Sequence, residues 1–289
     1  MFRSCLCAAL AVLFSAVVVA AEPVSRAQIA TLLEGHHWAA ARPLIERLLE
    51  ANPQDTDALH NLGIVQLNQE QDEAAVATLE KLAALAPANA DYACTLGDAY
   101  GNRAQKASLF SAAGWARKCQ AAYEHAVSLD PASVRAHQSL MMYCLQAPGF
   151  LGGGKDQAYA QAAAIKKIDL LQGQQAYATL YLQEKKYAEA FALFEEILQS
   201  SPDNYPVLYQ VGRLAAVTGE HLDRGIACLQ RCLTLPVPPD APEHAKAHWR
   251  LGTLLEKQGD KSGARMAYEA ALRLEPGFKP ARESLQALR

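Results

Sequence analysis

The sequence contains few aromatic residues, and its charges almost balance. Aromatic residues make up 7% of the 289 residues, and the formal net charge at pH 7 is −3. Such a chain has no global field that would attract nucleic acid or an anionic membrane surface. Alternating runs of β-branched and polar residues are also scarce, so we expect essentially no β-sheet. These features predict an all-α protein with no nucleic-acid partner.

The sequence also lacks the spaced residue sets that carry catalysis or bind metals. It has no HExxH pattern and no serine or cysteine in a nucleophile elbow. The segment from Gly149 to Lys155 matches most of a phosphate-binding loop, but Asp156 occupies the position where Ser or Thr would hold Mg²⁺. We interpret its glycines as a turn that allows positive φ and leads into a helix. We therefore expect no enzyme, cofactor or metal; nucleotide binding by this segment is the least favoured alternative.

Long apolar runs are absent except at the N-terminus. Arg3 precedes an apolar run from Cys5 to Ala20, and Ala21 is followed by Glu22. This arrangement is typical of a secretory signal peptide, here cleaved near Ala21. An uncleaved anchor is the alternative, but the run is shorter than the roughly 20 residues that a spanning helix needs. We expect residues 1–21 to be removed and residues 22–289 to act in the periplasm or outside the cell, without stable membrane insertion.

The cysteines that follow the signal peptide form neither a zinc pattern nor a disulfide framework. Their number is odd, and their spacings fit no zinc site. Cys228 and Cys232 lie one helical turn apart, which is a poor geometry for a bond between them. We expect small buried thiols in helix contacts at Cys94, Cys119, Cys144, Cys228 and Cys232.

The clearest positive feature is a spaced pattern of small and apolar residues near the C-terminus. In order, it contains Leu251-Gly252, Gly259-Asp260, Ala264, Tyr268, Ala271-Leu272 and Pro276. Small residues let two helix backbones approach closely, while Tyr268 and Leu272 fill the space between them. Gly259-Asp260 is suited to the turn between the helices, and Pro276 to the end of the second one. Such a pair cannot bury its apolar face alone, so it predicts neighbours of the same kind.

This pattern resembles the tetratricopeptide repeat (TPR), a pair of antiparallel helices of about 34 residues. Similar patterns recur along the chain, four of them specific and three degenerate. The resemblance implies an all-α, right-handed TPR superhelical solenoid of about seven repeats, with a capping helix at 278–289. The expected repeats are 24–53, 56–87, 90–131, 134–170, 171–202, 205–236 and 245–276.

Two segments depart from the repeat length. The third repeat carries about ten extra residues within 101–113, which we interpret as an elongated first helix, with or without a projecting turn. The fourth repeat contains the Gly-rich segment 147–155. An insertion in a solenoid lies on one face and often serves function, but a tolerated surface loop explains it equally. Together the two segments resemble a group of exported bacterial TPR proteins, a resemblance that implies no particular activity.

The family resemblance implies binding through the concave surface that the first helix of each repeat lines. The residues that we expect in this groove are Asp57, Asp91, Asp98, Asn102, Arg135, Gln138, Gln175, Thr179, Tyr209, Arg213, Lys246 and Trp249. The early members are acidic and the later ones mainly basic. We therefore expect an extended protein or peptide segment whose basic part lies towards repeats two and three. A solvated inner surface without a ligand would show the same pattern.

The groove does not match the carboxylate clamp of chaperone-binding TPR domains. Lys246 and Arg250 fit the last pair of the clamp, but Gln175, Thr179 and Gln210 occupy its other positions. The sequence therefore predicts a non-enzymatic scaffold or adaptor of the bacterial periplasm that binds a partner segment. The alternative is an envelope-associated protein that binds glycan or assembles with itself, for which Tyr209 and Trp249 would suit sugar stacking.

Overall fold

A computed structural model describes residues 25–239 and 241–288. Within these ranges the chain forms fifteen α-helices and one short 3₁₀ helix, and no strand. The all-α prediction is confirmed. The predicted signal peptide, residues 1–21, lies outside the described residues. None of the described helices is both long enough and apolar enough to cross a membrane.

The chain divides into two compact units, Met1–Thr78 and Leu79–Arg289. The described part of the first unit contains three helices and the start of a fourth. These are α1 (Arg26–Glu34), α2 (Trp38–Ala51), α3 (Thr56–Asn68) and the beginning of α4 (Asp72–Leu85). Its core is centred on Ile29, Ile45 and Val65, each almost fully buried.

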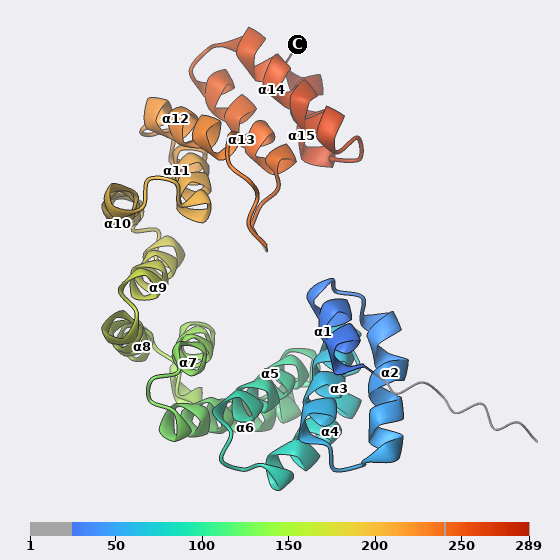
Figure 1. The fold of residues 1–289 in the computed structure, drawn as a ribbon. Coiled ribbons are helices and arrows are strands. Elements are labelled where there is room, and N and C mark those ends of the chain that lie inside the picture. The colour runs from blue at the N-terminus through green and yellow to red at the C-terminus, as the bar shows by residue number, and fades with distance from the viewer. Residues whose placement is uncertain (1–24, 240, 289) are drawn as a thin grey trace, which may run out of the picture. The chain divides into compact units, whose positions relative to one another are not determined.

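The second unit contains the rest of α4 and eleven further helices, most of them in consecutive pairs (Figure 1). The pairs are α5 (Ala90–Lys106) with α6 (Leu109–Leu129), α7 (Val134–Gln146) with α8 (Lys155–Ile168), α9 (Leu170–Gln183) with α10 (Tyr187–Ser200), α11 (Tyr205–Thr218) with α12 (Leu222–Cys232), and α13 (His244–Lys257) with α14 (Lys261–Leu274). The last helix, α15 (Lys279–Ala287), packs against α13 and α14. First helices of neighbouring pairs touch where α5 meets α7, α7 meets α9 and α11 meets α13.

Polar side chains fix where the first helices of four pairs begin. Asn89, Ser133, Asp169 and Asn204 each accept a hydrogen bond from the backbone N–H three residues further on, at 2.9 to 3.2 Å. These caps satisfy donors that the first turn of a helix leaves unpaired, and each contributes about 1 kcal/mol. The caps of α5, α7, α9 and α11 therefore set the register that positions the residues of the first helices.

Glycines opposite large side chains bring the helices of a pair together. In α13 and α14, Tyr268 is 1% exposed and lies against Gly252, where a Cβ would come within 2.5 Å of the tyrosine ring. The same relation holds between Gly97 of α5 and Tyr123 of α6, and between Gly212 of α11 and Leu229 of α12. The predicted role of Gly252 at a close helix approach is confirmed.

The extra residues of the third repeat lengthen both of its helices. The sequence-based interpretation assigned them to an elongated first helix, but α5 has 17 residues and α6 has 21, with a short turn at Ala107 and Ser108. By contrast, α8, α10 and α14 have 14 residues each. The extension is therefore a longer helix pair rather than a longer first helix alone.

The Gly-rich segment forms a compact turn, as predicted. It contains the 3₁₀ helix η1 (Gly149–Leu151), followed by Gly152 with φ of 77° and Gly154 with φ of 150°. Both values lie where side chains other than glycine are strained. The next helix, α8, begins at Lys155.

All five cysteines of the described chain are free and buried, which matches the prediction. Burial raises the pKa of Cys119 to about 12 and that of Cys228 to about 11. Because the thiolate is the reactive form, these thiols are unreactive at neutral pH.

We expect this burial to make thiol labelling slow in the folded protein. At pH 7.5, the chain that begins at Glu22 should react with a disulfide reagent about 100-fold more slowly when folded than in urea, because an unfolded cysteine has a pKa near 8.5. The absorbance of the released thiolate measures both rates. If any of the five cysteines reacted at its unfolded rate in the folded protein, the packing described above would be contradicted.

Candidate partner-binding site

The predicted groove residues fall on the first helices of six pairs. Asp57 belongs to the first unit, where its carboxylate lies 3.5 Å from Arg26. The other eleven are in the second unit, on a surface that we call the first-helix face and that is formed by α5, α7, α9, α11 and α13. They are Asp91, Asp98, Asn102, Arg135, Gln138, Gln175, Thr179, Tyr209, Arg213, Lys246 and Trp249.

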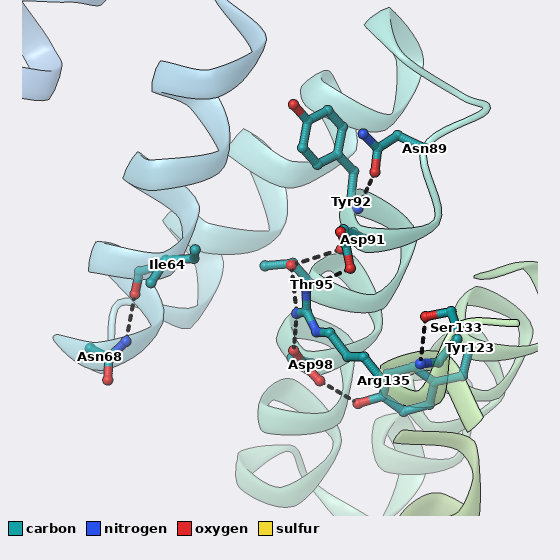
Figure 2. A network of polar contacts seen from close by, with 11 residues as sticks. Ile64, Asn68, Asn89, Asp91, Tyr92, Thr95, Asp98, Tyr123, Ser133 and Arg135 are labelled. Carbon is teal, nitrogen blue, oxygen red and sulfur yellow. Dashed lines mark hydrogen bonds and ion pairs between the residues drawn. The ribbon is translucent and has the colours of Figure 1, made fainter. Parts of the chain in front are cut away.

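Arg135 joins α7 to α5 through a polar network (Figure 2). Its guanidinium lies 3.3 Å from Asp91 and 3.4 Å from Asp98, and it donates a hydrogen bond of 2.9 Å to Thr95. Tyr123 of α6 donates to the other oxygen of Asp98 at 2.7 Å. The acidic part of the first-helix face is thus partly neutralised by a cation of the protein itself. It offers a partner less negative charge than the sequence indicates.

This network is partly exposed, so its net stabilisation is modest. The side chains of Arg135 and Asp98 are 42% and 41% exposed. Ion pairs at such positions contribute about 0 to 1 kcal/mol because water screens them and their side chains lose freedom. A basic side chain of a partner can therefore compete with Arg135 for Asp98 at little cost.

Two predicted aromatic residues are not available for stacking. Tyr209 is 6% exposed and belongs to the core formed by α9 to α14. Trp249 is half-buried, donates from Nε1 to Ser284 of α15 at 3.1 Å, and meets Phe278 edge to face. The repeat register placed both residues on the right helices, but it did not show which way each ring points. The stacking surface that a glycan would need is not formed by these two rings.

The remaining predicted residues differ in their polar contacts. Thr179 donates to the backbone of its own helix at 3.0 Å, and Gln138 reaches Gln172 of α9 at 3.4 Å. Arg213 donates to Gln210 of its own helix at 2.6 Å, whereas Lys246 is exposed. The later part of the first-helix face therefore presents two cations, and neither has an ion pair with a carboxylate among the described residues.

A cavity of about 740 Å³ lies between α5, α6, α7 and η1. Three predicted groove residues line it, namely Asp98, Asn102 and Gln138. Much of its wall is apolar and comes from Ala112, Ala113, Ala116, Met142, Pro148 and Leu151. The cavity thus adjoins the first-helix face and extends towards the lengthened helix pair and the Gly-rich turn.

The Gly-rich turn is held against the end of α7. Tyr143 donates to the carbonyl of Leu151 at 2.7 Å, and the N–H of Gly154 donates to the carbonyl of Cys144 at 2.8 Å. At Gly153 a Cβ would overlap the carbonyl group of Ala147. Only glycine therefore allows the turn to close at this position. The closed turn places Pro148 and Leu151 in the wall of the cavity.

The cavity carries a single formal charge. Of the described residues that line it, only Asp98 has a charged side chain. Burial raises the pKa of Tyr143 to about 12 and that of Cys119 to about 12, and it raises the pKa of Tyr123 further. These groups are neutral at pH 7, so the site has a weak negative charge.

The described residues offer no metal site, and the lysine of the loop-like Gly-rich segment has an acidic partner. Three or more His, Cys, Asp or Glu residues do not cluster anywhere in the described chain in a way that could hold a metal ion. Lys155, which would contact phosphate in a P-loop, lies 3.3 Å from Glu184 instead. Positive φ at Gly152 and Gly154 and the close approach of Ala147 to Gly153 account for three glycines of the segment.

Comparison with known families agrees with this architecture. Models of the tetratricopeptide repeat match residues 32–96, 171–204 and 214–277, which together make up more than half of the chain. The chain is a tetratricopeptide repeat protein. A search of curated proteins gives no match.

Solved TPR structures share the fold of this TPR protein. A TPR protein from Parabacteroides merdae is 16% identical with a TM-score of 0.56, over 91% of this chain and 96% of that one. The pilF protein of Pseudomonas aeruginosa is 18% identical with a TM-score of 0.54, over 82% of this chain and all of that one. Yeast Tom70 is 17% identical with a TM-score of 0.62, over 87% of this chain but only 51% of that one. At such identities the likeness concerns the fold alone.

The sequence reasoning identified both unusual segments of this TPR protein but not that they line one cavity. The sequence did contain a signal that the two segments are neighbours. Segment 101–113 includes the C-terminal end of α5, segment 147–155 follows the C-terminal end of α7, and α5 and α7 belong to neighbouring repeats. Connections at the same end of stacked helix pairs lie on the same edge of a solenoid. The two departures could therefore have been expected to meet.

Proposed function

We propose that this TPR protein is a non-enzymatic scaffold that binds an extended segment of a partner protein on its first-helix face. TPR folds typically serve as protein-interaction scaffolds, which supports the general role. The observation that carries the more specific proposal is the cavity beside α5 and α7, because Asp98, Asn102 and Gln138 of that face line it. A face with a cavity of this volume offers a place where a bound segment can be anchored.

The side chains of the face suit the polar groups of an extended peptide. Asn102, Gln138 and Gln175 are half-buried, so binding would cost them little additional side-chain freedom. Each side-chain amide has two donor hydrogens and one acceptor oxygen, which match the carbonyl and N–H of a peptide group. Such contacts hold a backbone in place without requiring a particular sequence.

The charges of the face give the bound segment a direction. Arg213 and Lys246 lie on α11 and α13, whereas Asp91 and Asp98 lie on α5. Complementary charges favour an acidic stretch of the partner near α11 and α13, and an uncharged or basic stretch near α5. Arg135 reduces the preference for basic residues at the α5 end but does not reverse it.

We further propose that this binding takes place in the periplasm. The support is the pattern of residues 1–23, in which Arg3, an apolar run and Ala21 follow the order of a secretory signal peptide.

No described feature favours the glycan or nucleotide alternatives, since Tyr209 is buried and Lys155 faces Glu184.

The test is a comparison of proteins that co-purify with two charge-reversed variants. Arg213→Glu combined with Lys246→Glu alters the first-helix face. Arg265→Glu combined with Lys261→Glu makes the same change of charge on exposed positions of α14. We expect quantitative mass spectrometry to find a protein that the wild type and the α14 variant retain equally. The face variant should lose it about tenfold or more.

Two results would count against the proposal. One is a set of co-purifying proteins that does not differ between the face variant and the α14 variant. The other is a protein lost only from the α14 variant, which would place the interaction on the second helices.

A further inference from the structure

We propose that the cavity between α5, α6, α7 and η1 accepts a large apolar side chain from an uncharged or basic stretch of the partner protein. This inference rests on the proposed function and specifies which part of the partner would be recognised at this end of the first-helix face. The occupant is a side chain of an extended protein segment, such as Trp, Phe or Leu, with its neighbouring backbone.

The size and lining of the cavity support an apolar occupant. Its volume of about 740 Å³ lies within the range of roughly 300 to 1,000 Å³ that is usual for ligand pockets. Ala112, Ala113 and Ala116 of α6 leave this space open, because their side chains are short. Water against such a wall finds few hydrogen-bond partners, so an apolar group that displaces it gains free energy.

Two exposed aromatic residues lie on the segments that form the cavity. Phe110 and Phe150 are 99% and 78% exposed, the highest values among the large apolar side chains of the described residues. Ala112 and Leu151 line the cavity. Phe110 lies two residues before Ala112, and Phe150 directly precedes Leu151. Neither ring lines the cavity itself, but both are exposed on the two segments that contribute to its wall, and exposed aromatic residues are enriched at contact surfaces.

Charge disfavours an acidic occupant. No described lysine or arginine lines the cavity, and the one charged lining residue is Asp98. A carboxylate or phosphate that entered would lose its hydration without gaining an opposite charge from the lining, and Asp98, although Arg135 partly neutralises it, would not attract it. An uncharged or basic segment meets neither penalty. Asn102, Gln105 and Ser139 offer hydrogen bonds to its peptide groups.

The cavity also differs from the packing of an ordinary helix pair. Between α13 and α14, Tyr268 fills the space against Gly252, and it is fully buried. Beyond the equivalent Gly97–Tyr123 contact, α5 and α6 continue with Gly101, Ala112, Ala113 and Ala116. The residues of the extension on α6 that line the cavity are thus all alanines, while its tryptophan, Trp115, packs against Tyr100 instead. A large side chain of the partner would fill this space, as Tyr268 fills the space between α13 and α14.

The experiment selects binders from a displayed library of random peptides and measures them on defined variants. Peptides enriched on the wild-type protein are labelled, and their affinities are measured by fluorescence anisotropy. Ala116→Phe fills the cavity from within. Phe110→Ser with Phe150→Ser removes the two exposed rings, and Met266→Ser on α14 is the control because Met266 is also exposed.

We expect the enriched peptides to share a large apolar residue with few acidic neighbours. Ala116→Phe and the double Phe→Ser variant should each weaken binding about tenfold or more, whereas Met266→Ser should leave it unchanged. Circular dichroism verifies that each variant is folded. If Ala116→Phe does not fold, Ala113→Leu replaces it, because Ala113 lines the same cavity.

Several outcomes would overturn the inference in distinguishable ways. Peptides that bind both cavity variants like the wild type, but weaken on Arg213→Glu with Lys246→Glu, would remove the cavity and leave the proposed function standing. Enriched peptides that are acidic around their apolar residue would contradict the charge argument. A small apolar molecule that co-purifies, is lost in Ala116→Phe and is not displaced by any peptide would assign the cavity to a metabolite. If no peptide binds the first-helix face, both proposals fail.

Discussion

Replacing Gly153 by alanine is expected to disrupt the connection between α7 and α8. A Cβ at this position would overlap the carbonyl group of Ala147. That carbonyl is backbone, so it cannot move aside as a flexible side chain could. Relief of the overlap would have to break the hydrogen bond from Gly154 to Cys144 or move η1 away from the cavity. We expect a loss of about 3 kcal/mol, at the upper end of the usual cost of overpacking.

The measurement is local hydrogen exchange together with urea unfolding. Because repeat arrays can unfold in parts, faster amide exchange in residues 134–168 reports the damage more directly than a global midpoint. Gly149→Ala is the matched control in the same segment, since a Cβ there meets no atom within 4 Å. Equal protection of the two variants would mean that the turn does not close as described.

Replacing Tyr268 by alanine is expected to unfold the C-terminal helices at a lower denaturant concentration. Tyr268 is 1% exposed, lies against Gly252, and donates to Glu256 at 2.8 Å. Removing a buried aromatic ring costs about 3 to 5 kcal/mol through lost apolar burial and the cavity that it leaves. Since Tyr268 packs among residues of α13, α14 and the last helix segment, this region should lose protection before the rest of the second unit.

Tyr268→Phe separates the ring from its hydroxyl. It keeps the packing against Gly252 and loses the hydrogen bonds of the hydroxyl, chiefly the one to Glu256, so we expect a cost of about 1 kcal/mol. Urea unfolding of the two variants, with exchange measured in residues 244–288, gives the comparison. If alanine and phenylalanine had the same effect, the ring would not be a principal contact of this helix pair.

The fold could be predicted because its determinants are local and repeated. A glycine opposite a large side chain lets two helices pack closely. Gly252 with Tyr268 is one such pair, and Gly97 with Tyr123 is another. The turn at Gly152 also follows from residue type, since glycine is the residue that adopts positive φ without strain. The extension of the third repeat was less predictable. Residues 101–113 suit a helix on either side of the short turn that separates α5 from α6.

The candidate site could be predicted only in part, because register fixes the position of a Cα atom but not the direction of a side chain. Asp98 and Gln138 line the cavity beside the first-helix face. Tyr209, which the repeat register also assigned to the groove, is buried instead. The sequence shows the opposite charges of Arg135 and Asp91. It does not show that the guanidinium of Arg135 on α7 lies within ion-pair distance of Asp91 on α5.

The cavity itself could not be read from the sequence, because it depends on what the side chains leave unfilled. Ala112 and Ala116 are ordinary helix formers, and nothing in their spacing distinguishes a close helix contact from an open space. The path of η1 adds the remaining wall and is set by hydrogen bonds such as that from Tyr143 to Leu151. These contacts are non-local consequences of stacking two unusual repeats.

In-cell photo-crosslinking from position 138 tests the central claim most directly. A photoreactive amino acid replaces Gln138, which lies on the first-helix face and lines the cavity, and the same amino acid replaces the exposed Arg265 of α14 as a control. We expect a discrete protein adduct from position 138 that position 265 does not give, and mass spectrometry of the adduct identifies the partner. Adducts from position 265 alone, or only to a second copy of this chain, would contradict binding on the first-helix face.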